Sequence, residues 1–212
     1  MSKIIVNSIT HSGNSGTENL TLDNSGNVTV AGNLSVTGTG GSPILEQFFY
    51  PCVGDTVTTS AGDITLGNVT EGLVGTTTYV DLTGSTIAYT PPSGTKTVIY
   101  EFQFAHARAG DSLQIGHFKF YIDSDEVTKA YLTHGCEDVL DLITFKWPIR
   151  IGGTADTTSG RVASWTSAKT LKLQYRDYSS TADTKCHRVS YTDGTTSDTV
   201  VIPRIGITAL TT

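Results

Sequence analysis

Aromatic residues are absent from the first 47 positions of this 212-residue chain, and all 18 of them (7 Phe, 9 Tyr and 2 Trp) lie at or after Phe48. Before Pro43 there are only three charged residues, Lys3, Glu18 and Asp23. A segment without aromatic side chains does not easily build a globular core of its own. The composition therefore predicts a boundary near residue 44, with the core-forming unit after it.

Charge is also scarce, since charged residues make up only 16% of the chain, and the formal net charge is −6. So low a share argues against a disordered polyelectrolyte and against a long charged coiled coil. The Lys and Arg residues are scattered singly, without the basic face that a duplex DNA binder carries. We therefore expect no nucleic acid among the partners.

Long apolar runs and a disulfide framework are missing too. No run approaches the roughly 18 residues that span a bilayer, and the start, Met1 to Asn7, has too short an apolar stretch for a secretory signal. Synthesis in a cytoplasm is therefore expected. The three cysteines, Cys52, Cys136 and Cys186, are odd in number and widely spaced, which predicts buried free thiols.

Short apolar pairs are what the first part of the chain does contain. Three such pairs lie between residues 20 and 38, namely Leu20 and Leu22, Val28 and Val30, and Leu34 and Val36. Within each pair one Thr or Ser stands between the two apolar residues, and Gly and Asn lie between the pairs. This pattern predicts strands of three or four residues joined by tight turns. A single copy would expose its apolar face and its edges, so we expect three chains to wrap around one axis. The alternative is a flexible linker.

After Phe48, apolar and polar residues alternate in four stretches, which predicts half-buried strands. The residues expected to face inward are Val98, Tyr100, Phe102 and Phe104; Phe118, Phe120 and Ile122; Ile143, Phe145, Trp147, Ile149 and Ile151; and Leu171, Leu173 and Tyr175. Turns rich in Gly and Pro separate these stretches, and no stretch shows a helical stripe. The pattern is typical of an antiparallel β-sandwich or jelly roll.

Four further features refine this expectation. Pro148 falls on the polar side of its stretch, which favours an edge strand or a bulge. The apolar stretch from Thr199 to Leu210 is expected to lie centrally in a sheet or at a subunit interface. Residues 39–47 indicate a hinge, and residues 48–86 form either a separate subdomain or the first strands of the sandwich.

Two parts of the chain resemble phage proteins. Residues 20–38 resemble the stem repeats near the N-terminus of phage tail fibre and short tail fibre proteins. Residues 87–210 are similar to a C-terminal module in tail fibres of cyanophages and other marine phages, through segments 98–102, 117–123, 145–156 and 165–174. In architecture alone, the part of the chain after Phe48 also resembles the heads of trimeric jelly-roll proteins of the complement and tumour-necrosis-factor (TNF) type.

The resemblance implies a virion appendage, namely a trimeric tail fibre or spike that binds the host cell surface. It implies a virion-anchoring segment (residues 1–19), a trimeric β-rich stem (residues 20–44) and an antiparallel β-sandwich head (residues 45–212). The expected partners are two further copies of the chain, other virion proteins, and a host surface polysaccharide or outer-membrane component. The alternative is a capsid decoration or cement protein, so location on the tail or on the capsid exterior stays open.

Residues with catalytic or metal-binding potential are few. His134 with Cys136, and Cys186 with His187, have the spacing of no standard zinc finger. The acidic residues at 123–126 and at Asp138 and Asp141 do not match a calcium loop. The chain is too short for the long parallel β-helices that cleave polysaccharide, and it has no Gly-x-Ser-x-Gly motif. We therefore expect no catalytic residue, no metal, no cofactor and no enzymatic activity.

Recognition is expected to fall on aromatic residues in or beside polar turns, because such side chains stack on sugar faces. The candidate glycan or receptor contacts are Trp165, Arg176, Asp177 and Tyr178, and Tyr131 lies in a similar setting. The alternative for Trp165 and Tyr178 is that they close the ends of the sandwich core.

Overall fold

The computed structural model describes residues 8–9, 20–22, 28–30, 43–108, 114–136, 140–181, 184–192 and 196–212. The chain divides into two compact units, Met1–Ser42 and Pro43–Thr212. No described helix is long and apolar enough to cross a membrane.

The first unit contains a small antiparallel sheet. Its strands are β1 (Ser8–Ile9), β2 (Leu20–Leu22) and β3 (Val28–Val30), in the order β1-β2-β3. Leu20 is opposite Val30 and Leu22 is opposite Val28 in the register of β2 and β3. The strands predicted at these two apolar pairs are therefore confirmed, whereas Leu34 and Val36 lie outside the described residues.

The second unit holds two antiparallel sheets, each of six strands among the described residues. The first sheet contains β4 (Ile44–Pro51), β7 (Leu73–Val74), β10 (Thr97–Arg108), β14 (Asp141–Arg150), β16 (Thr184–Cys186) and β19 (Arg204–Leu210). The second contains β8 (Val80–Asp81), β9 (Ile87–Tyr89), β11 (Gln114–Ile122), β12 (Asp125–Glu126), β13 (Leu132–Cys136) and β15 (Lys169–Asp177).

Smaller elements complete the second unit. They are the hairpins β5 (Thr56–Thr59) with β6 (Gly62–Thr65) and β17 (Arg188–Thr192) with β18 (Thr196–Val200), and one 3₁₀ turn, η1 (Thr128–Ala130). Residues 48–86, which the sequence pattern left open, supply β5 to β8, and β7 pairs with the first sheet and β8 with the second.

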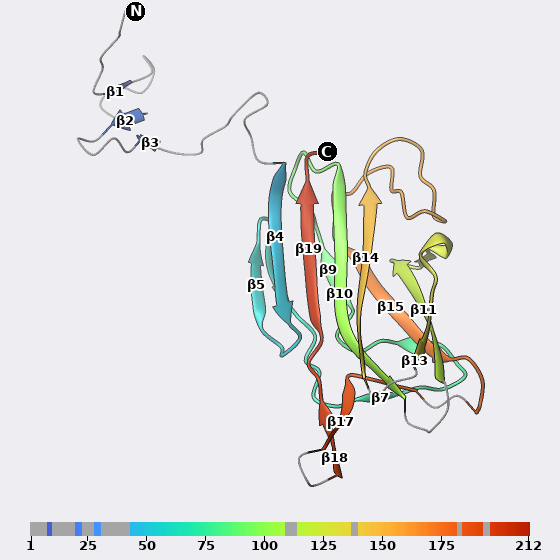
Figure 1. Ribbon diagram of the computed structural model, residues 1–212. Coiled ribbons are helices and arrows are strands. Elements are labelled where there is room, and N and C mark those ends of the chain that lie inside the picture. Colours follow the sequence, from blue (N-terminus) through green and yellow to red (C-terminus); the bar gives the residue numbers. More distant parts are fainter. Residues whose placement is uncertain are drawn as a thin grey trace, which may run out of the picture. The chain divides into compact units, whose positions relative to one another are not determined.

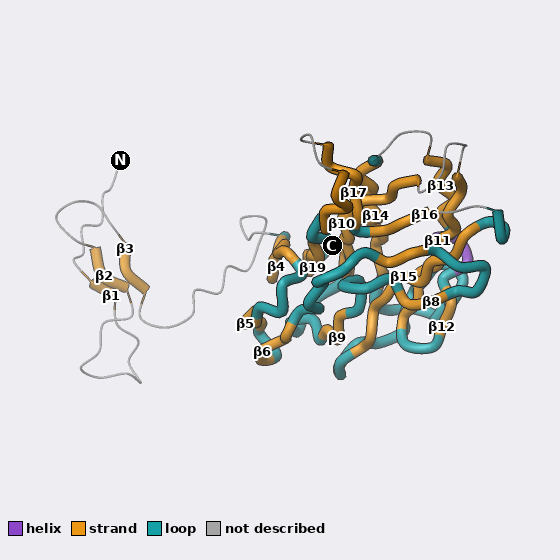
Figure 2. Tube along the Cα trace, turned by 90° about the horizontal axis from the view of Figure 1, so that it is seen from below, coloured by secondary structure: helices purple, strands orange, loops and turns teal. Residues whose placement is uncertain are grey.

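The order of the long strands is that of a jelly roll. When β4, β9, β10, β11, β13, β14, β15 and β19 are numbered one to eight, the first sheet runs β4-β19-β10-β14, or 1-8-3-6, and the second runs β9-β15-β11-β13, or 2-7-4-5. Two sheets connected in this order form the eight-stranded double-sheet jelly roll. Seen from below, the two rows of strands stand as opposed layers (Figure 2). The predicted antiparallel β-sandwich is confirmed.

Aromatic side chains from both sheets fill the space between the layers. The ring of Tyr100 lies 5.1 Å from that of Phe120, and Phe120 lies 5.3 Å from Phe145. Phe118 lies 5.2 Å from both Phe104 and Tyr175. The burial of β10, β11, β14 and β15 alternates along each strand, with the predicted apolar residues inward. This core fixes the outward direction of the alternate residues, which form the surface of each sheet.

The edge position expected for Pro148 is confirmed, and the central position expected for the stretch from Thr199 to Leu210 is confirmed for its second part only, because Thr199 and Val200 belong to the hairpin strand β18. Among the described residues β14 pairs only with β10, so Pro148 lies on an edge strand, where its missing N–H breaks no further pairing. The terminal strand β19 lies between β4 and β10. The hinge expected at residues 39–47 is wrong for residues 44–47, which belong to β4 and pair with β19.

The sandwich has two ends that differ in what they carry. At the proximal end the N–H of Thr211 donates to the carbonyl of Pro43 at 2.9 Å, and the C-terminus lies beside the start of β4 (Figure 1). Thr97 is opposite Arg150 at this end. At the distal end His106 is opposite Asp141, and Gly116 is opposite Asp177. Tyr178, which follows β15, therefore lies at the distal end.

Candidate functional site

The four predicted contact residues divide between the core and the surface. Trp165 is 6% exposed, and its indole N–H donates to the carbonyl of Tyr89 at 3.0 Å. Asp177 is 3% exposed and accepts hydrogen bonds from Tyr175 at 3.0 Å and from Thr184 at 2.6 Å. Trp165 therefore closes the core, which is the alternative considered for it, and Asp177 holds the distal end of β15 together.

Arg176 and Tyr178 occupy the other face of β15. The inward residues of this strand are Leu171, Leu173, Tyr175 and Asp177, so the residues between and after them point outward. Tyr178 is 60% exposed. These two residues are the part of the predicted contact set that a ligand can reach.

The outer surface of the second sheet surrounds Arg176 and Tyr178 with further aromatic and cationic groups. We call this surface the tyrosine face, and its members are Tyr79, His117, Lys119, Tyr131, Arg176 and Tyr178. It spans β11, β15 and the segments that precede β8 and β13. Tyr131 is 54% exposed, so both ends of the face present an accessible phenol ring.

The distal half of the face centres on two rings. The ring of Tyr178 lies 5.7 Å from the imidazole of His117, whose Nδ1 is 2.9 Å from the hydroxyl of Thr133. The ring of Tyr79 lies 5.1 Å from the guanidinium carbon of Arg176 and 4.5 Å from Nζ of Lys119. Contacts between cations and ring faces hold such side chains in one arrangement. Burial, and then the charge of Arg176, lower the pKa of His117.

The proximal half is organised by Glu126. Its carboxylate accepts a hydrogen bond from Tyr121 at 2.6 Å, another from Tyr131, and an ion pair from Lys119 at 3.0 Å. The hydrogen bonds from Tyr121 and Tyr131 lower the pKa of Glu126 to about 2, against the effect of burial and with help from Lys119. The carboxylate therefore stays ionised at neutral pH and positions the exposed ring of Tyr131.

Such a face suits binding by stacking and hydrogen bonding. Tyrosine presents an apolar ring and a hydroxyl, and it loses little conformational entropy when it is bound. Here the rings are already held by cations and by Glu126, which reduces the ordering that binding requires. The face can therefore stack on sugar rings while Arg176 meets acidic substituents.

The other candidate groups do not assemble into a site. All three cysteines are free and buried, which confirms that prediction, and burial raises the pKa of Cys186 well above its ordinary value. Within the described part of the chain, no three His, Cys, Asp or Glu residues converge as metal ligands. His134 contacts the buried His106, with 3.0 Å between their Nδ1 atoms.

Comparison with known proteins gives little further. No family model matches the sequence, and no curated protein matches it. Two solved structures of infectious bursal disease virus are similar over most of the chain. The Gx strain structure has 9% identity and a TM-score of 0.34 over 84% of this chain and 40% of that one. The Gt strain structure has 10% identity and a TM-score of 0.29 over 89% and 62%. This chain thus spans less than two thirds of either protein, and such TM-scores establish neither a shared fold nor a shared function.

Three members of the tyrosine face were not among the predicted contacts. His117 and Lys119 occupy the polar positions of the stretch that alternates with Phe118 and Phe120, so the strand period places them outward. Tyr79 lies in the segment for which the sequence pattern gave no strand. Their convergence depends on the pairing of β8, β15 and β11.

Proposed function

We propose that this chain is a structural and adhesive protein of a virus particle, whose jelly-roll head binds a host surface polysaccharide through the tyrosine face. The observation that carries the proposal is the exposed, preorganised set of Tyr131 and Tyr178, with the ring of Tyr79 in contact with Arg176 and Lys119. The resemblance of residues 20–38 and 87–210 to parts of phage tail fibres supports its place on a virion.

The position of Tyr178 at the distal end favours polysaccharide binding by the tyrosine face. Pro43 and Thr211 meet at the proximal end, so the chain enters the sandwich there. The distal loops lie at the opposite end from this connection. A surface that begins at the distal end and extends along one sheet is open to a long ligand. Polysaccharides are ligands of that shape, and several weak stacking contacts add along their length.

The trimeric state is part of the proposal. The described strands of the first unit have two or three residues each, and strands so short bury little apolar surface within one chain. Three chains would supply the missing contacts, and they would present three tyrosine faces to one surface. Avidity then converts weak binding by one face into stable attachment.

Substitution of Tyr178 tests the adhesive role. Tyr178→Ala and Tyr131→Ala should each weaken binding of the intact protein to host cells or extracted polysaccharide by about tenfold, the effect of losing a well-placed aromatic contact. Tyr50→Ala is the matched control, because Tyr50 is 47% exposed but lies on β4 of the other sheet. Equal binding by all three variants and the unmodified protein would contradict the proposal.

A further inference from the structure

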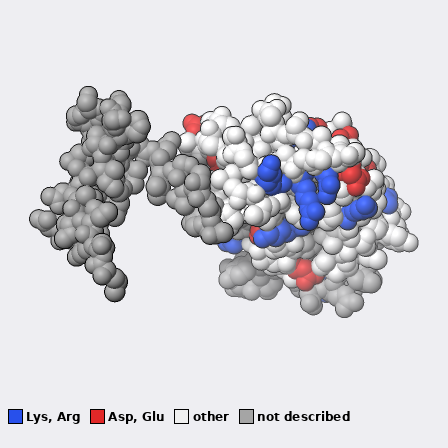
Figure 3. Space-filling model, turned by 90° about the horizontal axis from the view of Figure 1, so that it is seen from above, with Lys and Arg blue, Asp and Glu red and all other residues white. Residues whose placement is uncertain are grey.

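A group of cations at the proximal end is not explained by the tyrosine face. Lys96, Arg150 and Arg161 line one hollow of about 600 Å³, together with Thr97, Pro148, Ile151, Gly152, Gly153 and Thr212. No carboxylate side chain is among these lining residues. Figure 3 views this end and shows Lys and Arg gathered near its middle, with Asp and Glu beside and around them. We call the three cations and their hollow the basic hollow.

These cations differ from five other lysines of the head. Lys119, Lys129, Lys146, Lys169 and Lys172 each form an ion pair of 2.8 to 3.8 Å with Asp or Glu. Among the described residues, no ion pair or side-chain hydrogen bond involves Lys96, Arg150 or Arg161. On a chain with a formal net charge of −6, three adjacent cations that pair with no Asp or Glu side chain are unexpected, and the carboxylate nearest to them in the lining is the main-chain one of Thr212.

The backbone holds the three cations in place. The N–H of Ile151 donates to the carbonyl of Lys96 at 2.8 Å, and the N–H of Val162, next to Arg161, donates to the carbonyl of Arg150 at 3.0 Å. Gly152 and Gly153 have φ values of 105° and 74°, which favour glycine. A Cβ on Gly153 would lie 3.6 Å from Nη1 of Arg161. Gly153 therefore borders the guanidinium of Arg161.

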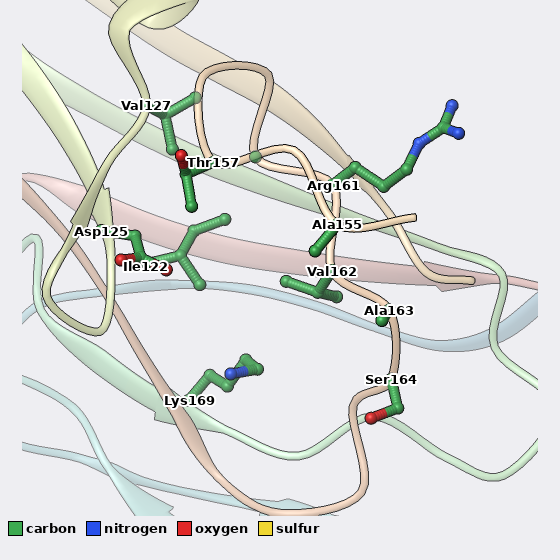
Figure 4. Close-up of a pocket in the computed structure, with 11 residues that line it drawn as sticks. Ile122, Asp125, Val127, Ala155, Thr157, Arg161, Val162, Ala163, Ser164 and Lys169 are labelled. Atoms are coloured by element: carbon green, nitrogen blue, oxygen red, sulfur yellow. The ribbon is translucent and has the colours of Figure 1, made fainter. Parts of the chain in front are cut away.

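Three more hollows adjoin this one around the loop of residues 152–164, and one of them, of about 240 Å³, shares Pro148, Arg150 and Arg161 with it. Another, of about 430 Å³, shares Lys96, Ile151 and Gly152 with the basic hollow. The third, of about 210 Å³, shares Arg161 with it. This smallest hollow has an apolar floor that includes Ile122, Val127 and Val162, and a polar rim of Asp125, Thr157, Ser164 and Lys169 (Figure 4). In that view the Arg161 side chain points away from Ile122 and Val127.

We propose that the basic hollow binds a sulfate or phosphate group carried by a sugar, with the sugar ring in an adjoining hollow. Two arginines suit the geometry of a tetrahedral oxyanion, because each guanidinium donates two parallel N–H bonds. The apolar floor and the hydroxyl groups of the smallest hollow suit one face and the edge of a sugar ring. The acidic chain disfavours duplex nucleic acid. This site is at the other end of the head from Tyr178 and does not depend on the proposed adhesive role.

The test measures oxyanion binding by the intact protein. Calorimetry or NMR titration would use a sulfated chondroitin tetrasaccharide, the same tetrasaccharide without sulfate, and inorganic phosphate. We expect saturable binding of the sulfated probe that weakens as salt rises, because the Debye length falls from about 10 Å at 0.1 M to 3 Å at 1 M. The double variant Arg150→Gln/Arg161→Gln should lose at least about tenfold in affinity, the effect of two charge-assisted hydrogen-bonding groups.

The control variant is Arg204→Gln/Lys172→Gln. It removes the same charge from residues that contact Gln103 and Asp81 on the outer faces of the sheets, away from the basic hollow. Its affinity should stay within about twofold of the unmodified protein. Binding of phosphate with no preference for the sulfated sugar would assign the site to the free ion and overturn the sugar part. Absence of saturable oxyanion binding, or equal losses in both double variants, would overturn the site itself.

Discussion

Acidification from pH 7.5 to pH 5 should destabilise the head through two buried histidines, His106 and His187. Both side chains are 0% exposed. Burial lowers the pKa of His106 to about 4, with a further contribution from His134 and a smaller opposing one from Asp141. Burial also lowers the pKa of His187 to about 4. In the unfolded chain each imidazole has a pKa near 6.5.

The sign and size follow from proton binding. Between pH 6.5 and pH 4 the unfolded chain binds more protons than the folded chain, so the free energy of unfolding falls as the pH falls. At pH 5 each histidine removes about 2 kcal/mol relative to pH 7.5, and the two together remove about 4 kcal/mol. That is a large share of the roughly 5–15 kcal/mol that stabilises a typical domain. The carboxyl groups of Glu126 and Asp156 have pKa values lowered to about 2, so their ionised forms stabilise the folded chain. This stabilisation begins to be lost only when the pH falls to about 4.5.

Urea denaturation at the two pH values measures this effect at a fixed chain concentration. Tryptophan fluorescence suits the assay, because Trp147 and Trp165 both lie in the second unit. The double variant His106→Gln/His187→Asn removes both titrations, and Asn is chosen because residue 187 has a φ of 62°. Its stability should change by less than about 1 kcal/mol between the two pH values. An unmodified protein equally stable at pH 5 and pH 7.5, or a double variant with the full loss, would refute the reasoning.

Two other predictions concern the core and the assembly. Gly116→Ala should lower the free energy of unfolding by about 1–3 kcal/mol, because its Cβ would lie 2.8 Å from Nε2 of His106 and 3.1 Å from Cε2 of Tyr175; an unchanged melting temperature would show that these rings move aside. Light scattering should give the mass of three chains for the full-length protein, and a stable monomer at micromolar concentration would contradict the trimeric stem.

The long strands were predictable because each alternates over many residues. Along β14, Ile143, Phe145 and Ile149 are buried while Thr144, Lys146 and Pro148 are exposed, and this period needs no knowledge of the partner strand. The shortest strands were not predictable. β7 and β8 have two residues each, and they are strands only because β16 and β15 offer unpaired edges beside them. Two residues cannot display a period of two, so tertiary pairing alone decides their conformation.

The exposure of some predicted contact residues follows from the local strand period, whereas that of others depends on residues far away in the sequence. The period of β15 places Arg176 outward and Asp177 inward, so the sequence held the information that separates these neighbours. Trp165 and Tyr178 are different, since both stand beside polar turns and local pattern does not distinguish them. Trp165 is buried because it packs against Tyr89, 76 residues away, whose ring lies 6.2 Å from its own and whose carbonyl accepts its indole N–H. Tyr178 has the imidazole of His117 beside its ring and stays largely exposed. The tyrosine face and the basic hollow both depend on residues that strand pairing brings together from distant parts of the chain, so neither has a sequence motif, and substitution of the converging residues tests both.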